Sequence, residues 1–561
     1  MDSGFAIPST LSFSAVSNVV STSDKDVTAV KEVKVYEKKA ILASGSSTGV
    51  TGYVERAFYY DYLGRVIQTV EKNHLGGISR TSIKYDLAGN ILKQHESHQR
   101  GPGFTADTKL TTFTYDVRGR MLSETTIING STSGTVTYAY NELGQLTGKT
   151  YGNGATESMA YNIQGWLNSK DAVKSGTNLF SMNLLYYNST RAANKFTGNI
   201  AEWQWTQGTA SQNSYALSYD KLSRLLNSNR YVGGTSTNAF TEQNITYDKN
   251  GNITQLQRYG STGSLQDNFT FNYNGATHNG NRLSSISGSV SATYAYDNNG
   301  NMTTDGRKNL QISYNVLNLQ QSISQNSTTM AEYSYLSDGT KCGVVDNTTN
   351  GYDYLGSLIY SRSGSVRTLE SAAFGGGRFV NTNNTILPYY YITDQLGSTR
   401  VITDNSGSVV ERNDYYPFGG KHANSGYAQL TTNKQKFNGK ELQTTGNTGF
   451  LDYGARMYDD VIGRWGVVDP MAEGYYRHSP YHFSGNNPIR FLDLNGMNYG
   501  DFVDEKGNII GNDGISDGKV YVVKSTESGT SKSDIKATKD FIKTNSGNTE
   551  AFKNNSTAYN K

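Results

Sequence analysis

Few residues in this chain have types and spacing that suggest chemistry. Its 561 residues include one cysteine, Cys342, which excludes intrachain disulfides and CxxC metal sites, and its seven histidines form no HExxH motif. Aspartates followed by turn residues are another kind of candidate, such as Asp469 in "VVDP" and Asp493 in "FLDLNG". Two carboxyl groups that meet can hydrolyse a peptide bond, one ionised to activate water and one protonated to polarise the carbonyl. By themselves, however, Asp-Pro and Asn-Gly are turn signals, so the residues alone favour structural turns.

Other candidate sites are weaker, and we expect neither a cofactor nor a metal. His95 and His98 have the spacing of metal ligands, but an exposed polar strand explains them better. Aromatic residues could stack on sugars, although strands of the core or edge explain them as well; these are Tyr389, Tyr390, Tyr391, Tyr415 and Tyr416. Asp513 and Asp517 lie near glycines but lack the spacing and closing Glu of an EF-hand calcium loop.

Composition points to a folded protein that does not bind nucleic acid. The chain has 60 Gly, 41 Tyr and only 7 Pro, and its net charge is +3 without long blocks of like charge. A nucleic-acid surface would need a basic patch, so polyanions are unlikely partners. We find no apolar stretch of about 18 residues that could cross a bilayer, and no recognisable signal peptide.

A tyrosine-centred pattern recurs from residue 51 onward. Each copy has an alternating run, then Tyr-Asp or Tyr-Asn, a few variable residues, Gly, and a second alternating run. The clearest copies begin at Tyr60, Tyr85, Tyr115, Tyr140, Tyr161, Tyr219, Tyr247 and Tyr296. The first five copies are spaced 25, 30, 25 and 21 residues apart, which is typical of repeat proteins.

Each repeat predicts a β-hairpin. Asp or Asn starts the turn through its side chain, and Gly supplies the positive φ that the turn requires. Flanking residues alternate with period two, so one face of each hairpin is buried. Because a hairpin cannot bury that face alone and strands twist, the hairpins must stack into a continuous spiralling sheet. We therefore predict an all-β fold.

The composition changes after about residue 345. Five of the seven prolines lie in the last third of the chain, and irregular turn clusters replace the regular spacing. Beyond Met497 the chain is rich in Lys, Asn, Ser, Thr and Gly. We predict four parts: a polar N-terminal segment (1–50), a repeat region (51–345), a second module (346–497) and a tail (498–561).

The repeats resemble the YD repeats of Rhs proteins, of insecticidal toxin-complex subunits and of teneurins. The module after residue 345 resembles the Rhs repeat-associated core, and its amino-acid sequence looks most like the versions of this core found in Bacteroidetes-type bacteria. Five segments in the expected order carry this resemblance: "YYITDQLGSTRVITD" (389–403), "ERNDYYPFGG" (411–420), "KFNGKEL" (436–442), "LDYGARMYDDVIGRWGVVDP" (451–470) and "SPYHFSGNNPIRFLDLNGM" (479–497).

The resemblance implies a hollow shell plugged by a self-cleaving core. In that family the YD ribbon winds into a cocoon, and the core is an aspartyl autoprotease that releases a C-terminal toxin inside it. Here the implied acids are Asp469 and Asp493, and Arg464 in "GRW" matches the family's core arginine. The implied cut lies between Met497 and Asn498, beside Gly496, whose lack of a side chain lets the backbone approach the acids.

This sequence departs from the family pattern at two positions. Asp460 stands at the usual Pro of "YDPxxGR", and Leu494 stands at the usual Pro of "DPxG". A proline fixes φ beside the catalytic aspartate, so Leu494 could loosen the geometry of cleavage. We expect Asp459 and Asp460 to be turn residues, with an extra carboxylate near the acid pair as the alternative.

The expected function is a secreted or cell-surface shell that holds its own tail as cargo and cleaves itself once. Expected partners are secretion machinery and an immunity protein, in a polymorphic toxin used for interbacterial competition. One alternative is a non-catalytic adhesion protein that binds carbohydrate or another cell through the YD ribbon. Another is an inactive fragment of a larger Rhs toxin, lacking part of the shell or the toxin domain.

Overall fold

The structure, a computed structural model, is almost entirely β. It describes residues 7–26, 33–45, 49–274, 280–424, 426–475 and 478–497, and the backbone of four short strands in the tail. Among these residues no helix is long and apolar enough to cross a membrane. The predicted all-β class is confirmed.

The strands run in chain order with short turns between them. The first half comprises β1 (Tyr36–Leu42), β2 (Val50–Tyr60), β3 (Val66–Lys72), β4 (Ile78–Tyr85), β5 (Ile91–His98), β6 (Asp107–Tyr115), β7 (Met121–Ile128), β8 (Thr132–Tyr140), β9 (Leu146–Tyr151), β10 (Ala155–Tyr161), β11 (Leu167–Lys174), β12 (Thr177–Leu185), β13 (Glu202–Gln207), β14 (Asn213–Tyr219), β15 (Leu225–Val232), β16 (Thr235–Tyr247), β17 (Ile253–Tyr259), β18 (Leu265–Asn272), β19 (Ser285–Gly288) and β20 (Ala292–Tyr296).

The second half comprises β21 (Met302–Asp305), β22 (Leu310–Tyr314), β23 (Gln320–Gln325), β24 (Thr328–Leu336), β25 (Lys341–Val345), β26 (Asn350–Leu355), β27 (Leu358–Ser363), β28 (Val366–Phe374), β29 (Gly377–Thr382), β30 (Thr385–Thr393), β31 (Thr399–Thr403), β32 (Val409–Arg412), β33 (Glu441–Leu442), β34 (Leu451–Asp452), β35 (Met457–Asp459), β36 (Arg464–Trp465), β37 (Phe502–Asp504), β38 (Ile509–Gly511), β39 (Lys519–Val523) and β40 (Ala558–Asn560). The helical turns are η1 (Ser9–Leu11), η2 (Phe437–Gly439), η3 (Thr445–Asn447), η4 (Ala472–Tyr475) and η5 (Ser484–Asn486).

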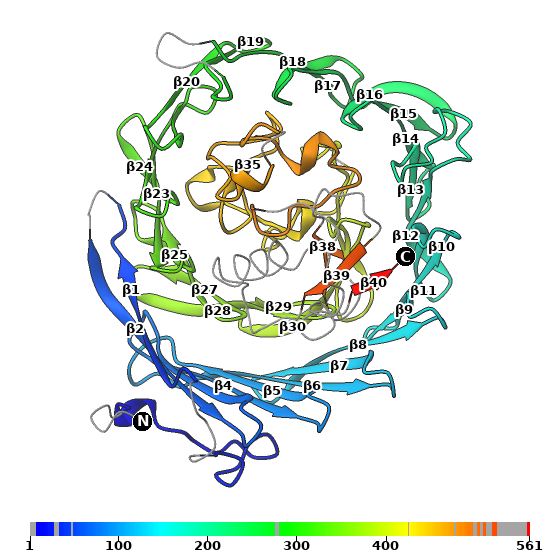
Figure 1. Ribbon diagram of the computed structural model, residues 1–561. Coiled ribbons are helices and arrows are strands. Elements are labelled where there is room, and N and C mark those ends of the chain that lie inside the picture. Colours follow the sequence, from blue (N-terminus) through cyan, green and yellow to red (C-terminus); the bar gives the residue numbers. More distant parts are fainter. Residues whose placement is uncertain are drawn as a thin grey trace.

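Strands β1 to β32 form one antiparallel sheet that closes into a ring and then winds inward (Figure 1). Each strand pairs with the next along the chain, and β1 also pairs with β24, which closes the ring. Strands β27 to β30 lie inside the ring, beside β4 to β8 (Figure 1). Hydrogen bonds join the two layers, such as Lys109 Nζ to Ser357 Oγ at 2.6 Å and Tyr360 Oη to Asp107 at 3.0 Å. The predicted spiral of hairpins is confirmed.

The turn after each repeat tyrosine is built as its sequence indicates. In the turn after Tyr115, Asp116 Oδ1 accepts the amides of Arg118 at 2.8 Å and Arg120 at 3.0 Å. Gly119 has a φ of 78°, which disfavours a side chain. Arg120 donates back to Asp116 at 2.6 Å and on to the carbonyl of Asn141, in the next repeat, at 3.1 Å. The turn residues therefore link each hairpin to its neighbour.

The repeat tyrosine links neighbouring hairpins through its hydroxyl group. Tyr115 Oη donates to the carbonyl of Ile91, the first residue of β5, at 2.8 Å. The same bond to a carbonyl near the start of the preceding repeat's second strand is made by Tyr85, Tyr140, Tyr161, Tyr219 and Tyr247. Because the ring packs between hairpins while the hydroxyl is satisfied, tyrosine suits this position better than phenylalanine.

The chain leaves the sheet after Arg412 and enters the ring. Residue 345, where the composition changes, is the last residue of β25, and the sheet continues through β26 to β32 without a break. The irregular segment that follows contains a small sheet of β33 to β36 and lies in the middle of the ring (Figure 1). Part of the predicted second module thus extends the spiral, and the rest fills its centre.

We predict that Tyr219→Phe will lower the free energy of unfolding by about 1 kcal/mol, the usual contribution of one hydrogen bond. Tyr219 Oη donates to the carbonyl of Ile200 at 2.8 Å, and Phe keeps the ring but removes this donor. Urea unfolding followed by tryptophan fluorescence measures the change. Tyr62→Phe, at a ring that is 65% exposed, is the matched control and should leave the unfolding midpoint unchanged. Equal midpoints for both variants would contradict the linking role.

Candidate active site

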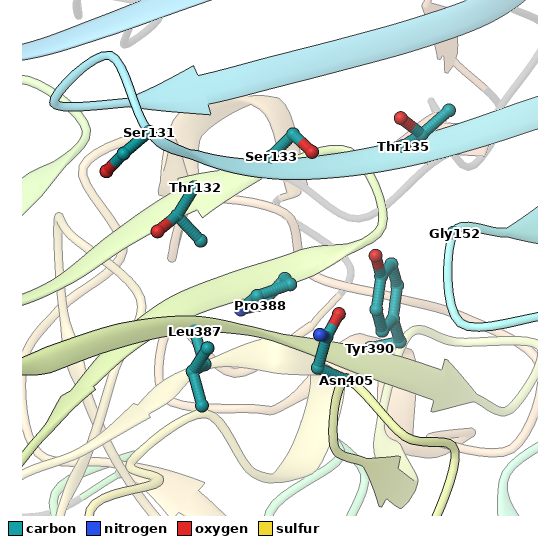
Figure 2. Close-up of a pocket in the computed structure, with 9 residues that line it drawn as sticks. All are labelled: Ser131, Thr132, Ser133, Thr135, Gly152, Leu387, Pro388, Tyr390 and Asn405. Carbon is teal, nitrogen blue, oxygen red and sulfur yellow. The ribbon is translucent and has the colours of Figure 1, made fainter.

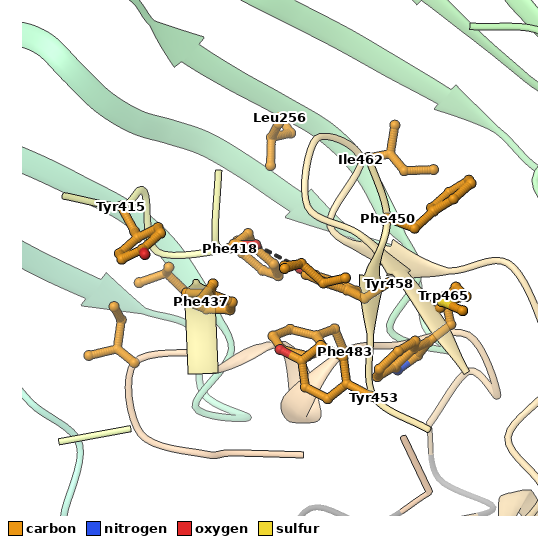
Figure 3. Packing of buried hydrophobic residues seen from close by; sticks show 14 of the residues in the cluster. Leu256, Tyr415, Phe418, Phe437, Phe450, Tyr453, Tyr458, Ile462, Trp465 and Phe483 are labelled. Atoms are coloured by element: carbon orange, nitrogen blue, oxygen red, sulfur yellow. Dashed lines mark hydrogen bonds between the residues drawn. The ribbon is translucent and has the colours of Figure 1, made fainter. Parts of the chain in front are cut away.

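Four aromatic side chains packed against one another form the centre of the core segment (Figure 3). Tyr453, Tyr458, Trp465 and Phe483 are each at most 3% exposed, and the rings of Tyr458 and Phe483 stack with centroids 4.0 Å apart. Tyr458 Oη donates to the carbonyl of Phe418 at 2.8 Å. This cluster fixes β35 and β36 and therefore the loops that follow them.

The structure brings Asp469 and Asp493 together on one arginine. Arg456 Nη2 lies 3.0 Å from Asp469 Oδ2 and 3.2 Å from Asp493 Oδ2. Both aspartates and Arg456 are at most 5% exposed. Asp469 and Asp493 lie 24 residues apart in two separate segments of the sequence, so the pair exists only in the folded core.

Arg456, rather than the predicted Arg464, is the arginine of this site. Its guanidinium lies 4.2 Å above the Trp465 ring, and its Nε donates to the carbonyl of Gly496. Arg464 instead donates to Tyr273 Oη at 2.7 Å and to the carbonyl of Asn281 at 2.8 Å. Its contacts with Tyr273 and Asn281 join the core to the shell.

The sequence contains a weak signal for Arg456. It lies in "YGARMYDD", directly before the strand β35 whose tyrosine enters the aromatic cluster. An arginine beside buried aromatic residues needs carboxylates or carbonyls as partners, since burying an unpaired guanidinium is costly. The local sequence does not show which carboxylates Arg456 contacts, because that depends on how distant segments fold together.

Both aspartates also form the turns that their sequences indicate. Asp469 Oδ1 accepts the amide of Met471 at 2.7 Å. Asp493 Oδ1 accepts the amides of Gly496 at 2.8 Å and Met497 at 3.2 Å. One carboxylate oxygen of each residue therefore shapes the backbone, while the other faces Arg456.

The segment before the predicted cut is held at alternate carbonyl groups. Lys440 Nζ donates to the carbonyl of Leu494, and Arg456 donates to that of Gly496. Gly496 has a φ of 75°, and a Cβ there would lie 3.0 Å from the Arg456 amide nitrogen, so only glycine fits easily. Leu494 lacks the fixed φ of proline, but its carbonyl is anchored by Lys440. Asn498, on the far side of the predicted cut, lies outside the described residues.

Burial raises the pKa of Asp493 to about 6, despite the opposing effect of the Arg456 guanidinium. The neighbouring Asp469 carboxylate adds to this rise. A raised pKa in one member of a close acid pair is the arrangement in which one carboxyl keeps a proton while the other is ionised. The site therefore has the electrostatics of an acid–base pair.

The two aspartates near β35 lie in a separate cluster. Asp459 is paired with Arg307 at 2.6 Å and with Lys308 at 3.4 Å. Arg258 of the shell donates to the carbonyl of Asp460 at 2.6 Å. Asp460, at the position of the usual proline, thus joins the core to the shell through its backbone.

Four of the five tyrosines considered as sugar platforms are buried. Tyr390, Tyr415 and Tyr416 are at most 5% exposed, so their rings cannot serve as sugar platforms. No group of three or more potential metal ligands occurs among the described residues, and Asp513 and Asp517 lie outside them.

A polar cavity of about 360 Å³ lies between the two layers of the sheet, at the turn before β8 and at β30 (Figure 2). Hydroxyl groups from both layers line it, and none of its lining residues is charged: Ser131, Thr132, Ser133, Thr135, Gly152, Leu387, Pro388, Tyr390 and Asn405. The aspartate pair is not part of its lining.

Solved structures of TcdB2-TccC3 have a similar fold. The crystal structure of TcdB2-TccC3 matches with a TM-score of 0.58 at 17% identity, over 80% of this chain and 27% of that one. The structure of TcdB2-TccC3 without its hypervariable C-terminal region gives the same TM-score over 80% of this chain and 26% of the other. At this identity the likeness concerns the fold.

Sequence relatives match over short segments. Toxin subunit YenC2 of Yersinia entomophaga is 32% identical over 111 residues, 19% of this chain and 11% of the relative. The tRNA3(Ser)-specific nuclease WapA of Bacillus spizizenii is 22% identical over 303 residues, 53% of this chain and 11% of the relative. Salivary gland surface protein 1 of Aedes aegypti is 36% identical over 112 residues, 19% of this chain and 3% of the relative. No family model matches. The chain spans a small part of each of these relatives.

We predict that the free energy of unfolding falls as pH rises through about 6, because Asp493 loses its proton in the folded protein. Its pKa in the folded protein lies above the ordinary value of 3.8, so the stabilisation from its protonated form is complete below about pH 4 and is lost as pH rises through about 6. The loss is on the order of 2 to 3 kcal/mol. Urea unfolding of wild type and Asp493→Asn from pH 4 to 7 measures it, since Asn stays neutral throughout.

As pH rises, the free energy of unfolding of the wild type should fall relative to that of Asp493→Asn. Asp116→Asn, in a shell turn, is the control and should follow the wild-type profile over the same range. A constant difference between wild type and Asp493→Asn would show that Asp493 is ionised throughout.

Proposed function

We propose that this chain is a toxin shell protein that encloses its own C-terminal segment and cuts itself once after Met497. The observation that carries the proposal is the pair of buried aspartates on Arg456, with Asp493 bonded to the amide of Met497. The closed sheet around the core and the toxin relatives support the enclosing role. In the view of Figure 1, the tail strands β38, β39 and β40 fall within the outline of the ring.

In the proposed reaction, water adds to the carbonyl carbon of Met497. Asp469 takes a proton from this water, and Asp493, whose pKa is the raised one, donates a proton toward the carbonyl oxygen. As the tetrahedral intermediate collapses, Asp469 gives its proton to the leaving nitrogen and Asp493 takes a proton back from a hydroxyl of the intermediate. The C–N bond breaks, leaving a carboxyl group on Met497 and an amino group on Asn498. Because the substrate is part of the same chain, the reaction occurs once per molecule.

Arg456 has a positioning role in this proposal. It holds both carboxyl groups on one nitrogen and the carbonyl of Gly496 on another, so it sets the distance between the acids and the peptide to be cut. Such fixed placement contributes to rate by removing the entropy cost of bringing the groups together. Lys440 adds a second anchor at Leu494.

The enclosed segment, residues 498–561, is the proposed cargo, and its own activity is not indicated by any motif. A toxin of this kind acts outside the cell that makes it. We therefore propose a secreted or cell-surface setting, with secretion machinery and an immunity protein as partners.

We predict that the wild-type chain separates into two pieces on a denaturing gel, while Asp469→Asn and Asp493→Asn remain intact. Removing either carboxyl group removes one of the two proton transfers that the reaction needs. Intact-mass measurement should give a smaller piece with the mass of residues 498–561. Denaturant is essential, because the pieces can stay together in the folded shell.

The control for this experiment is Asp116→Asn, a turn aspartate of the shell, which should cleave like wild type. An uncut wild-type chain would overturn the self-cleavage proposal. A cut at another bond would overturn the assignment of Met497.

We predict that Arg456→Lys slows cleavage by at least about tenfold, the effect of roughly 1.4 kcal/mol on the barrier. Lysine keeps the charge but cannot contact both carboxyl groups and the Gly496 carbonyl in one plane. Arg464→Lys is the matched comparison, since the Arg464 guanidinium donates to the shell residues Tyr273 and Asn281, and the change should leave the cleavage rate within about twofold of wild type. Loss of cleavage in Arg464→Lys, with Arg456→Lys unaffected, would reverse the two assignments.

A further inference from the structure

We propose that the junction between β1 and β24 is a seam at which the shell opens to release its contents. The release step rests on the proposed enclosing function, whereas the opening itself rests on the sheet topology. Figure 1 shows β1, from the N-terminal part of the chain, side by side with the green strands that end the ring.

The seam is the one junction of the ring, in the part of the chain that the structure describes, that no turn connects. Every other neighbouring pair from β1 to β24 is consecutive in sequence, so the chain itself keeps the two strands together. Strands β1 and β24 are separated by almost the whole ring. Parting them opens the ring without straining any hairpin.

Backbone pairing at the seam is short. Only Ile41 with Leu336 and Leu42 with Tyr335 are paired, whereas β1 and β2 pair through seven residues on each strand. Strands β19 and β20 also share only two residue pairs, but residues 289–291 join them directly. A short junction without a covalent link has the lowest cost of local opening.

Few side-chain contacts reinforce this pairing. Lys39 Nζ lies 2.7 Å from Asp338 Oδ2, with both side chains about a quarter exposed, and such pairs contribute little in water. Gln321 donates to the carbonyl of Ala43 at 3.0 Å. The apolar contacts are confined to a small cluster of Val54, Leu336 and Cys342, with Ile41 packed against it.

Opening at this place leads to the interior. Beyond β24 the sheet turns inward through β25 to β32. Strand β1 therefore belongs to the outer wall, whereas β25, which follows β24, begins the inner layer. Parting the seam therefore moves the edge of the outer wall away from the inner winding. The core is bonded to the wall through Arg464 and Arg258, and to β25 through Lys341, whose Nζ lies 2.6 Å from Asp452 Oδ2, so it stays with the β24 side when β1 parts.

Hydrogen exchange tests the seam itself. Ser337 donates its amide to the carbonyl of Ala40 at 2.8 Å. We expect this amide to exchange at least about tenfold faster than the paired amides of β6 and β7, which share seven residue pairs. If the Ser337 amide exchanges as slowly as the amides of β6 and β7, the proposal that the seam opens is wrong, independently of the digestion result for the tail.

A disulfide across the seam tests release. Because Ser337 and Ala40 are a hydrogen-bonded pair, the adjacent pair Ile41 and Leu336 is the non-hydrogen-bonded kind, whose Cα atoms are close enough for a disulfide. The variant is Ile41→Cys with Leu336→Cys, made in a Cys342→Ser background because Cys342 packs against both positions. Cys342→Ser alone is the matched control.

The readout is trypsin digestion of residues 498–561, which contain many lysines, in the native full chain. We expect the oxidised variant to lose its tail at least about tenfold more slowly than the same protein after reduction. Equal rates would overturn release through the seam. Immediate digestion of the tail in the wild type would contradict the enclosing function instead, and the exchange of Ser337 would still decide whether the seam opens.

Discussion

The backbone hydrogen bonds of a very long sheet govern the architecture of this protein. A stack of hairpins leaves an unpaired edge at each end, and an unpaired edge is a site for aggregation. Here the first edge, β1, pairs with β24, and the last strand, β32, continues into the core, where the Arg412 amide donates to the carbonyl of Ala428 at 3.0 Å. Closing the ring and winding inward solve the same problem, and together they create the enclosed space that the core occupies.

Within that space, one guanidinium group organises the candidate site. Arg456 is the cation common to Asp469 and Asp493, and it contacts the backbone beside the predicted cut. Without the arginine, burial and the closeness of the two carboxyl groups would both oppose ionisation of Asp493. The shell supports this arrangement indirectly, since Arg464 and Arg258 bond the core to the wall. The acid pair is therefore a property of the assembled shell and core.

Sequence reasoning identified the local structure well. Tyr115, Asp116 and Gly119 have side-chain and backbone preferences that act within one turn, so their spacing alone predicts the hairpin. Asp469 and Asp493 came from the family resemblance, and their meeting depends on contacts between distant segments. Arg464, the arginine named by the resemblance, contacts Tyr273 and Asn281 instead, and only the fold decides that Arg456 is the one that faces the acids. The pairing of β1 with β24 could not be predicted, since nothing in either strand's pattern specifies a partner so distant in sequence.

The linking of each hairpin to the next has a consequence for how this fold can vary. Because the tyrosine hydroxyl and the turn arginine reach only to the adjacent hairpin, a whole hairpin could be inserted or removed without changing any other contact of this kind. Each such step would alter the circumference by two strand spacings, about 10 Å. The core, however, touches the wall at fixed places, such as Tyr273 and Gly300. The circumference of the shell can therefore change only by whole hairpins, and the core that fills the shell limits how many hairpins can be added or removed.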